Sequence, residues 1–313
     1  MTLVSRRIKG KSYYYSSLSY FLINKSRSFS RYIGTVRPSM KELAAIENSF
    51  KEDLIGKLSG RRYSSILIGK DEVIKTLLFS DLFCKKYNTL SNLHKRKYDI
   101  DSTVSFTLTT LTTEEVDVDL ADVKNALKKD SRLSERERIS KAMLEAVELI
   151  KKGGKLERKS LLSLHKMIMA SFKTKTPGVF RNRQVYLLRK GEHSIGGTEI
   201  KYRPPDYKSL ERRIQQFVEW YDLSNLNPIE KASMAHYKLY TIHPFLDGNK
   251  RVCRLIFNRV LLENGFPLIN ISYNKEQYFD ALVDATEEGN PRAFLDFCIK
   301  QYYAQVKEFL IND

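Results

Sequence analysis

The chain has 313 residues, of which 42% are hydrophobic and 29% charged, a composition typical of one large globular domain or two smaller ones. No apolar run reaches the about 18 residues of a transmembrane helix, and serines interrupt the apolar residues near the basic N-terminus, which argues against a signal peptide. Cys84, Cys253 and Cys298 lack metal-ligand spacing and suggest reduced thiols. These features predict a cytoplasmic protein that does not enter a membrane.

The formal net charge of +17 is concentrated at one end of the chain. Residues 1–100 hold 20 Lys and Arg against 8 Asp and Glu, a difference of +12. Such asymmetry indicates an anionic partner, which could be nucleic acid, a nucleotide or an acidic protein surface. A basic surface that only aids solubility is the simpler alternative.

Residues 1–36 are rich in Tyr, Ser and Arg, with β-forming residues loosely alternating with polar ones. This pattern predicts two or three short strands that form a small basic β module. Interleaved Tyr and Arg could stack on bases and pair with phosphates, which makes nucleic acid a candidate partner. The two faces of a small antiparallel sheet explain the same pattern more simply.

Residues 37–116 are expected to form a helical region that ends in a connector. KELAAIENSFKEDLIGKL has the apolar spacing of an amphipathic helix, and residues 70–91 suggest another. Residues 97–116 are rich in Thr and Ser and low in charge, so they predict a strand, loop or connector. Thr112 is a plausible N-cap for a helix that starts at Thr113.

Residues 117–308 are expected to form a mainly helical domain. The predicted helices are SRLSERERISKAMLEAVELIKKGGK, LERKSLLSLHKMIMASF, KSLERRIQQFVEWYDL, PIEKASMAHYKLYTI, KRVCRLIFNRVLLENG and PRAFLDFCIKQYYAQVKEFL. One insert, residues 183–205, has two β-type runs around a Gly-rich tip, which predicts a β-hairpin.

The stretch HPFLDGNKRVCR, residues 243–254, places three cations where a helix begins. A helix N-terminus already carries a partial positive charge and unpaired N–H groups, so cations there favour a bound anion. Lys250, Arg251 and Arg254, with the backbone N–H groups of Gly248 and Asn249, are therefore interpreted as a polyphosphate site.

Two further residues of this stretch suit phosphate chemistry. Asp247 beside phosphates is a natural Mg²⁺ ligand. His243 could accept a proton from an attacking hydroxyl near neutral pH. Taken singly, a histidine, an Asp-Gly-Asn turn and basic residues are usually structural or solvated, and only their combination at one loop-to-helix junction predicts transfer from a nucleoside triphosphate to a hydroxyl.

HPFLDGNKRVCR resembles the signature of the Fic family, which includes the Doc toxins, and the resemblance extends over much of residues 135–305. TPGVFRNRQVYLL and YRPP are similar to the two ends of the family's flap segment. The resemblance implies the Fic helical bundle with a β-hairpin flap, here with the small N-terminal β module added. The flap, residues 185–202, would dock the target by strand addition through Val185, Tyr186, Leu187 and Leu188.

The resemblance also implies an activity, in which AMP passes from ATP to a Ser, Thr or Tyr hydroxyl of a target protein. His243 would be the general base and Asp247 would hold Mg²⁺. The remaining signature residues would bind the phosphates, with Arg254 on the γ-phosphate: Gly248, Asn249, Lys250, Arg251 and Arg254. The number of subunits is left open, with a homodimer among the options.

Two departures from the family pattern leave alternatives open. Lys250 replaces the second glycine of the AMP-transferring signature and also occurs in Doc, which moves phosphate, although Doc lacks the closing arginine that Arg254 supplies. Many Fic proteins carry an inhibitory glutamate that pairs with this arginine. Aligned by eye, that position falls on Thr107, near a degenerate segment at 103–108, which predicts weak or absent autoinhibition; Glu114 satisfies half of the pattern. A Doc-like phosphotransferase and a nucleotide- or nucleic-acid-binding regulator without transferase activity remain the alternatives.

Overall fold

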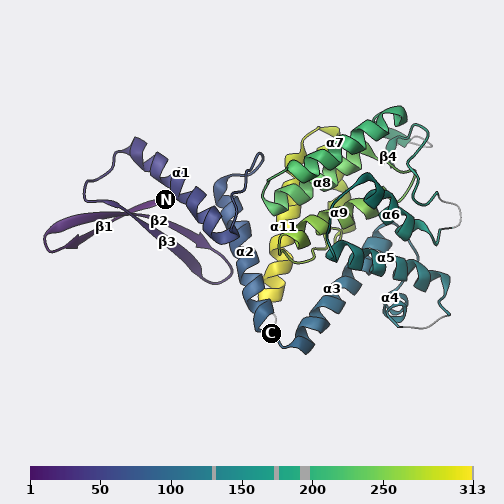
Figure 1. The fold of residues 1–313 in the computed structure, drawn as a ribbon, viewed down its shortest axis with the longest axis horizontal. Coiled ribbons are helices and arrows are strands. Elements are labelled where there is room, and N and C mark those ends of the chain that lie inside the picture. Colours follow the sequence, from purple (N-terminus) through teal and green to yellow (C-terminus); the bar gives the residue numbers. More distant parts are fainter. Residues whose placement is uncertain (129–131, 173–175, 191–197, 312–313) are drawn as a thin grey trace.

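The computed structural model of the chain describes residues 1–128, 132–172, 176–190 and 198–311. Three strands at the N-terminus are followed by a mainly helical body (Figure 1). The predicted fold class, mainly α with a β-hairpin and a small N-terminal sheet, is confirmed. Within these ranges, no helix combines the length and the apolarity that crossing a bilayer requires.

The N-terminal sheet consists of β1 (Thr2–Ile8), β2 (Lys11–Phe21) and β3 (Ser26–Gly34), paired antiparallel in the order β1-β2-β3. Alternate side chains of β2, including Leu18 and Tyr20, are buried against the helices that follow. The Tyr20 hydroxyl donates to Asp71 at 2.8 Å. One face of the sheet is thereby fixed to the body.

The helices of the body follow in chain order. They are α1 (Met40–Ser59), α2 (Lys70–Thr89), α3 (Asn92–Thr113), α4 (Leu120–Ala126), α5 (Glu135–Lys151), α6 (Arg158–Met169), α7 (Leu210–Leu223), α8 (Pro228–Ile242), α9 (Asn249–Glu263), α10 (Lys275–Glu287) and α11 (Pro291–Ile311). A single 3₁₀ turn, Tyr207–Ser209, leads into α7.

The centre of the body is the antiparallel pair α8 and α9, which carries the loop 243–248 between its two helices. α5 packs on α9, while α11 packs on both α8 and α2 (Figure 1). One cluster of buried apolar side chains runs from Leu18 of the sheet to Val306 of α11. The sheet and the helices thus share a core, and the division at residues 36 and 116 stays a prediction.

α3 corrects the expected connector at residues 97–116. Ser91 caps the helix by accepting from the backbone N–H of His94, and the helix continues through the Thr-rich run to Thr113. Thr112 is therefore in the last turn of a helix and does not start one. Weak helix propensity is overridden because apolar residues on more than one side of the helix, such as Val104, Phe106 and Leu111, are buried.

The expected hairpin is present as β4 (Leu187–Lys190) and β5 (Thr198–Tyr202), paired antiparallel. Val185 and Tyr186 precede β4, so the first strand begins later than its sequence pattern suggested. Leu188 pairs with Ile200 across the hairpin. The Gly-rich tip, residues 191–197, lies outside the described residues.

Candidate active site

His243 is the C-cap of α8 and has left-handed backbone angles, φ 50° and ψ 61°. Its carbonyl accepts from the Arg181 Nε–H at 2.8 Å, and the backbone N–H of Arg181 donates to the carbonyl of Pro244 at 2.9 Å. The Nδ1 atom lies 3.3 Å from the carbonyl of Tyr240, which fits an N–H donor at Nδ1 and leaves Nε2 as the proton acceptor. Burial lowers the pKa of His243 to about 4, so the ring is neutral at physiological pH.

His165 of α6 supports the loop through its ring and both of its ring nitrogens. Its ring stacks on Phe245 with centroids 3.7 Å apart and planes 6° apart. The backbone N–H of Gly178 donates to Nδ1 at 2.9 Å, so Nε2 carries the proton and donates to the carbonyl of Asp247 at 3.0 Å. His165 therefore fixes the loop at both its apolar plug and its acidic residue.

Gly248 and Asn249 form the junction between the loop and α9. Gly248 has φ 77°, and a Cβ atom there would lie 2.8 Å from Sδ of Met169, so the junction requires glycine. The Asn249 side chain donates to and accepts from the backbone of Phe245, at 2.8 and 2.9 Å. This amide closes the loop, which leaves the helix N-terminus and not the Asn249 side chain to face an anion.

Asp247 lies at the open side of this junction, with a side chain 36% exposed. One oxygen, Oδ1, accepts from the backbone N–H of Gly248 at 2.6 Å and lies 3.5 Å from Nη2 of Arg251. Mg²⁺ binds through one or two carboxylates together with substrate phosphates, so a single carboxylate beside a phosphate site suits it.

Arg251 is a buried cation with incomplete pairing. Its side chain is 3% exposed and lies over the ring of Phe172, 4.7 Å from the centroid. Within the described structure, Nε and Nη1 have no hydrogen-bond partner. Because buried, unpaired cationic donors cost free energy, this guanidinium suits an anionic ligand.

Arg254, fully buried, connects α9 to α3 and α10. Its Nη2 donates to the carbonyl of Thr110 and to Oε1 of Glu114, both at 3.0 Å. Nη1 lies 3.4 Å from the hydroxyl of Tyr278, which in turn lies 2.9 Å from Nε2 of His236. His236 therefore belongs to this buried network.

Glu114, at the end of α3, joins two of the three signature cations. Oε1 contacts Arg254, and Oε2 lies 3.3 Å from Nζ of Lys250. Burial alone would raise the pKa of Glu114, but the charges of Arg254 and Lys250 hold it below its ordinary value. The carboxylate is therefore ionised and occupies the cationic end of the site.

The assignment of the acidic position to Thr107 is wrong. Thr107 is fully buried in the middle of α3, and it precedes Glu114 by two helical turns, or roughly 10 Å along the axis. TLTTEE, residues 110–115, supplies the glutamate that contacts Arg254 instead. The expectation of weak autoinhibition, which depended on a neutral residue at this position, loses its basis.

Lys250 lies between Glu114 and an aromatic ring. Its Nζ is 4.2 Å from the ring centroid of Phe279 in α10, and the side chain is 29% exposed. Burial lowers its pKa, and the neighbouring Glu114 carboxylate opposes that shift. The lysine that departs from the AMP-transferring signature is thus held by the same carboxylate as Arg254.

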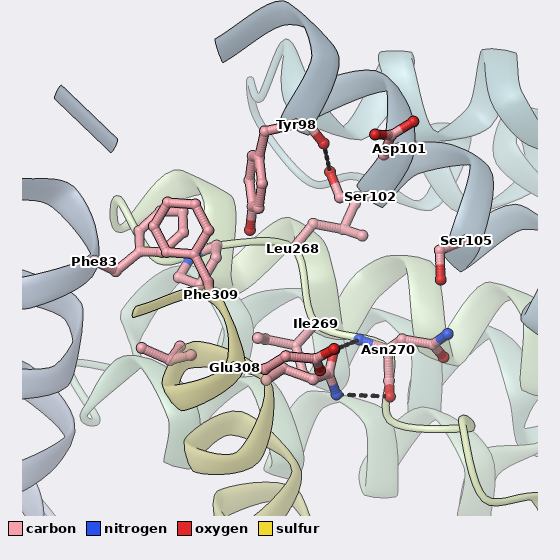
Figure 2. Close-up of a pocket in the computed structure, with 13 residues that line it drawn as sticks. Phe83, Tyr98, Asp101, Ser102, Ser105, Leu268, Ile269, Asn270, Glu308 and Phe309 are labelled. Carbon is pink, nitrogen blue, oxygen red and sulfur yellow. Dashed lines mark hydrogen bonds between the residues drawn. The ribbon is translucent and has the colours of Figure 1, made fainter. Parts of the chain in front are cut away.

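A separate surface cavity of about 450 Å³ lies between α2, α3, α11 and the segment after α9 (Figure 2). Its lining includes the rings of Phe83, Tyr98 and Phe309. The backbone N–H and carbonyl of Asn270, a lining residue labelled in Figure 2, form two hydrogen bonds with the side chain of Gln305. All of the residues that line it lie outside the stretch 243–254, so this hollow is distinct from the candidate site.

Residues 155–261, which include α6, the hairpin and the whole α8–α9 unit, match the model of the Fic/DOC family. This part of the chain is similar to the Fic/DOC family. Similar proteins include the protein adenylyltransferase Fic of Drosophila erecta, 34% identical over 139 residues, and that of Drosophila melanogaster, 33% identical over 139 residues. Both alignments cover 44% of this chain and 26% of the relative, so the chain spans about a quarter of those relatives' length.

Solved structures share the fold of the Fic/DOC domain and of much of the chain around it. A Fic domain containing signaling protein from Bacteroides thetaiotaomicron has a TM-score of 0.61 at 23% identity and covers 75% of this chain and 92% of its own. A Fic family protein from Desulfovibrio desulfuricans has a TM-score of 0.63 at 17% identity, with 79% and 76% covered. At these identities the likeness concerns the fold alone.

Proposed function

We propose that this protein is a nucleotidyltransferase that moves AMP from ATP to a Ser, Thr or Tyr hydroxyl of a target protein. The observation that carries the proposal is the buried guanidinium of Arg251. It has two nitrogens without a hydrogen-bond partner within the described structure, and it lies beside the N-terminus of α9, one helical turn from Arg254. Cations at this end of a helix oppose its dipole, which makes a polyphosphate their natural counterion. The names of the similar curated proteins support the AMP-transferring branch of the family.

The proposed reaction begins with removal of a proton from the target hydroxyl by Nε2 of His243. The hydroxyl oxygen then attacks the α-phosphorus of ATP, the bond from that phosphorus to the bridging oxygen breaks, and pyrophosphate leaves. The backbone N–H groups at the start of α9, with Arg251 and Arg254, would orient the phosphates for in-line attack. Asp247 would hold Mg²⁺, which supplies charge neutralisation on the phosphates when bound.

Glu114 restrains this reaction in the proposed mechanism. Its carboxylate forms ion pairs with Lys250 and Arg254, the two cations that the distal phosphates of ATP would need. ATP bound beside the carboxylate would meet like charge and adopt a pose unsuited to transfer. Activity therefore requires the end of α3 to move or Glu114 to exchange its partners.

The decisive experiment is incubation of the purified chain and of its Glu114→Gly variant with ATP labelled at either the α- or the γ-phosphate, Mg²⁺ and a protein extract. Transfer of α-label, stronger with Glu114→Gly, is expected. His243→Ala should reduce transfer by about 100-fold or more while ATP binding persists, since general-base catalysis contributes about 10²–10⁴-fold.

Transfer of γ-label alone would replace AMP transfer by the Doc-like phosphotransferase alternative, for which Lys250 is the favouring feature. If neither the parent chain nor Glu114→Gly transferred either label, the remaining reading would be a nucleotide-binding protein without transferase activity. Intact transfer by His243→Ala would remove that histidine from its role.

Partners and location belong to the same proposal. The hairpin β4–β5, with Val185 and Tyr186 leading into it, would hold the target segment by strand addition next to the active loop. We also propose that the protein acts in the cytoplasm. A homodimer remains an untested option, and nucleic acid is proposed as a partner of the N-terminal sheet only.

A further inference from the structure

The N-terminal sheet has one face that packs on helices and one that does not contribute to the core. Arg31 of β3 bonds to Ser49 and Asp53 of α1, and Arg27 pairs with Asp81 of α2 at 2.6 Å. These side chains and the buried Tyr20 belong to one face. In Figure 1 the sheet extends away from the helical body with α1 along one side.

The other face, which we call the open face, carries a group of three tyrosines. The strand register places Tyr13 and Tyr15 of β2 on the same face as Tyr32 of β3. Ring centroids of Tyr32 lie 6.2 Å from Tyr13 and 5.5 Å from Tyr15, and Tyr32 is 52% exposed. Arg6 of β1 lies over the Tyr15 ring at 5.1 Å, so a cation borders the aromatic group.

Hydroxyl groups and a second cation also lie on the open face, together with the exposed Ile8 and Phe21. Ser17 and Ser19 of β2 pair with Ser30 and Ser28 of β3, and the Oγ atoms of Ser19 and Ser28 are 2.8 Å apart. Lys11 of β2 has the same strand phase as the tyrosines. The face therefore combines flat rings, positive charge and small hydrogen-bonding groups.

The charge of this module is one-sided. Residues 1–41 contain nine Lys and Arg and no Asp or Glu. The carboxylates that approach the sheet come from α1 and α2 and bind Arg27 and Arg31 on the covered face. The field of the open face thus favours an anionic partner, independently of the Fic/DOC domain.

We propose that the open face binds single-stranded nucleic acid. Exposed rings in a sheet stack on bases that are already unpaired, while Arg6 and Lys11 neutralise phosphates and the serines bond to sugar or base edges. A duplex keeps its bases stacked inside and would meet only the cations. A lipid surface would favour a larger aliphatic area than this hydroxyl-rich face offers.

The test uses the full chain and fluorescence anisotropy with 5′-labelled 12-nucleotide oligo-dT, oligo-rU and a 12-base-pair duplex. Binding of the single strands, stronger than that of the duplex and weakened by salt, is expected. Tyr15→Ser and Tyr32→Ser should each weaken single-strand binding by about 5- to 100-fold, since stacking on an aromatic ring has that effect per base. Tyr273→Ser, at an exposed tyrosine outside the sheet, is the matched control.

Arg6→Ala and Arg7→Ala separate a phosphate contact on the open face from an effect of net charge. Each substitution removes one positive charge, but the two side chains lie on opposite faces of β1. Arg6→Ala should lower the salt slope of single-strand binding by about 0.7, the value for one phosphate contact, and Arg7→Ala should not. Thermal unfolding of each variant verifies that the sheet is intact.

Absence of oligonucleotide binding at low salt overturns the proposal. So does an equal loss of single-strand affinity in the two arginine variants together with unchanged affinity in the tyrosine variants. Binding to vesicles with anionic lipid but not to oligonucleotides would identify a membrane surface instead. His243→Ala should bind oligonucleotides like the parent chain, so failure of the transferase proposal would not affect this result.

Discussion

At the residue scale, the central contact is the carboxylate of Glu114 between Lys250 and Arg254. Arg254 is fully buried and Glu114 is 11% exposed, so the pair is shielded from water and from salt. Removing one member of such a pair leaves a buried charge uncompensated, which costs more than a surface ion pair contributes. In the structure, this carboxylate therefore contacts two of the cations that the proposed phosphate site would use.

Glu114→Gln should raise AMP transfer by about tenfold or more, because a hydrogen bond to a charged group contributes about 1.5–3 kcal/mol to the closed state. Without ligand, the same variant should unfold at a lower temperature than the parent chain. Addition of Mg²⁺ and ATP should raise its unfolding temperature by more than that of the parent. Label transfer and thermal unfolding measure the two effects. Glu115→Gln, which changes an exposed neighbour that pairs with Lys275, is the control and should change neither.

Lys250→Met tests the second contact of Glu114. In the parent chain it should increase transfer by a few-fold, since one of the two partners of the restraining carboxylate is lost. Combined with Glu114→Gln it should instead weaken ATP binding, because the ammonium is then free for phosphate. A double-mutant cycle with calorimetric ATP affinities gives the coupling, expected at about 1 kcal/mol. Additive effects would show that Lys250 and Glu114 act separately.

At the element scale, contacts from α6 support the start of α9 in addition to its own local sequence. His165 and Met169 of α6 lie directly against Gly248, and His165 also bonds to the backbone of Asp247. The helix that supports the active loop thus comes from a part of the chain whose sequence shows only apolar periodicity.

Gly248→Ala should abolish most activity for two reasons. The new Cβ would collide with Met169, and alanine would have to adopt left-handed backbone angles. Gly265→Ala is the matched control: it has φ 73° at the other end of α9, and nothing lies within 4 Å of its Cβ position. Both variants should lose about 1–2 kcal/mol from backbone strain, measured by urea unfolding. Met169→Ala added to Gly248→Ala should restore part of the activity; no restoration would contradict the collision.

α3 shows why element type was misjudged between residues 97 and 116. Threonine and serine have moderate helix propensity, and low charge there suggested a connector. In the folded protein, Thr113 donates to the carbonyl of Thr109 at 2.6 Å, and apolar neighbours of the run bury against α5 and α9. Tertiary packing outweighed a local preference of a few tenths of a kcal/mol per residue.

At the scale of the whole molecule, buried histidines make stability depend on pH. His165 and His236 are 2% and 0% exposed, and burial lowers the pKa of His165 to about 4 and that of His236 well below 6.5. Both are therefore neutral in the folded protein over a range in which they bind protons when unfolded. Their contribution is complete above about pH 6.5 and is lost progressively as the pH falls below it.

The free energy of unfolding should decrease between pH 8 and pH 5 by on the order of 2 kcal/mol for each such histidine. Urea unfolding at several pH values measures this slope. His236→Gln should lower stability at pH 8 but reduce the slope. An unaltered slope in His236→Gln would contradict this account.

The chemical content of the site and most of the helices follow from local patterns in the sequence. HPFLDGNKRVCR places its turn, helix start and cations by local rules of glycine, asparagine and proline, so the structure has the loop 243–248 and α9 where the pattern predicted them. The alternation of tyrosine and polar residues likewise predicted the N-terminal strands.

Only the tertiary structure decided which residue faces the signature cations. Glu114 and Arg254 are 140 residues apart in the chain, and their contact depends on how far α3 extends and how it is rotated against α9. A shift of two helical turns separates Thr107 from Glu114, and no local pattern fixes that phase. Packing of apolar side chains sets it, because the buried face of a helix, not its polar sequence, determines which of its residues meets a distant partner.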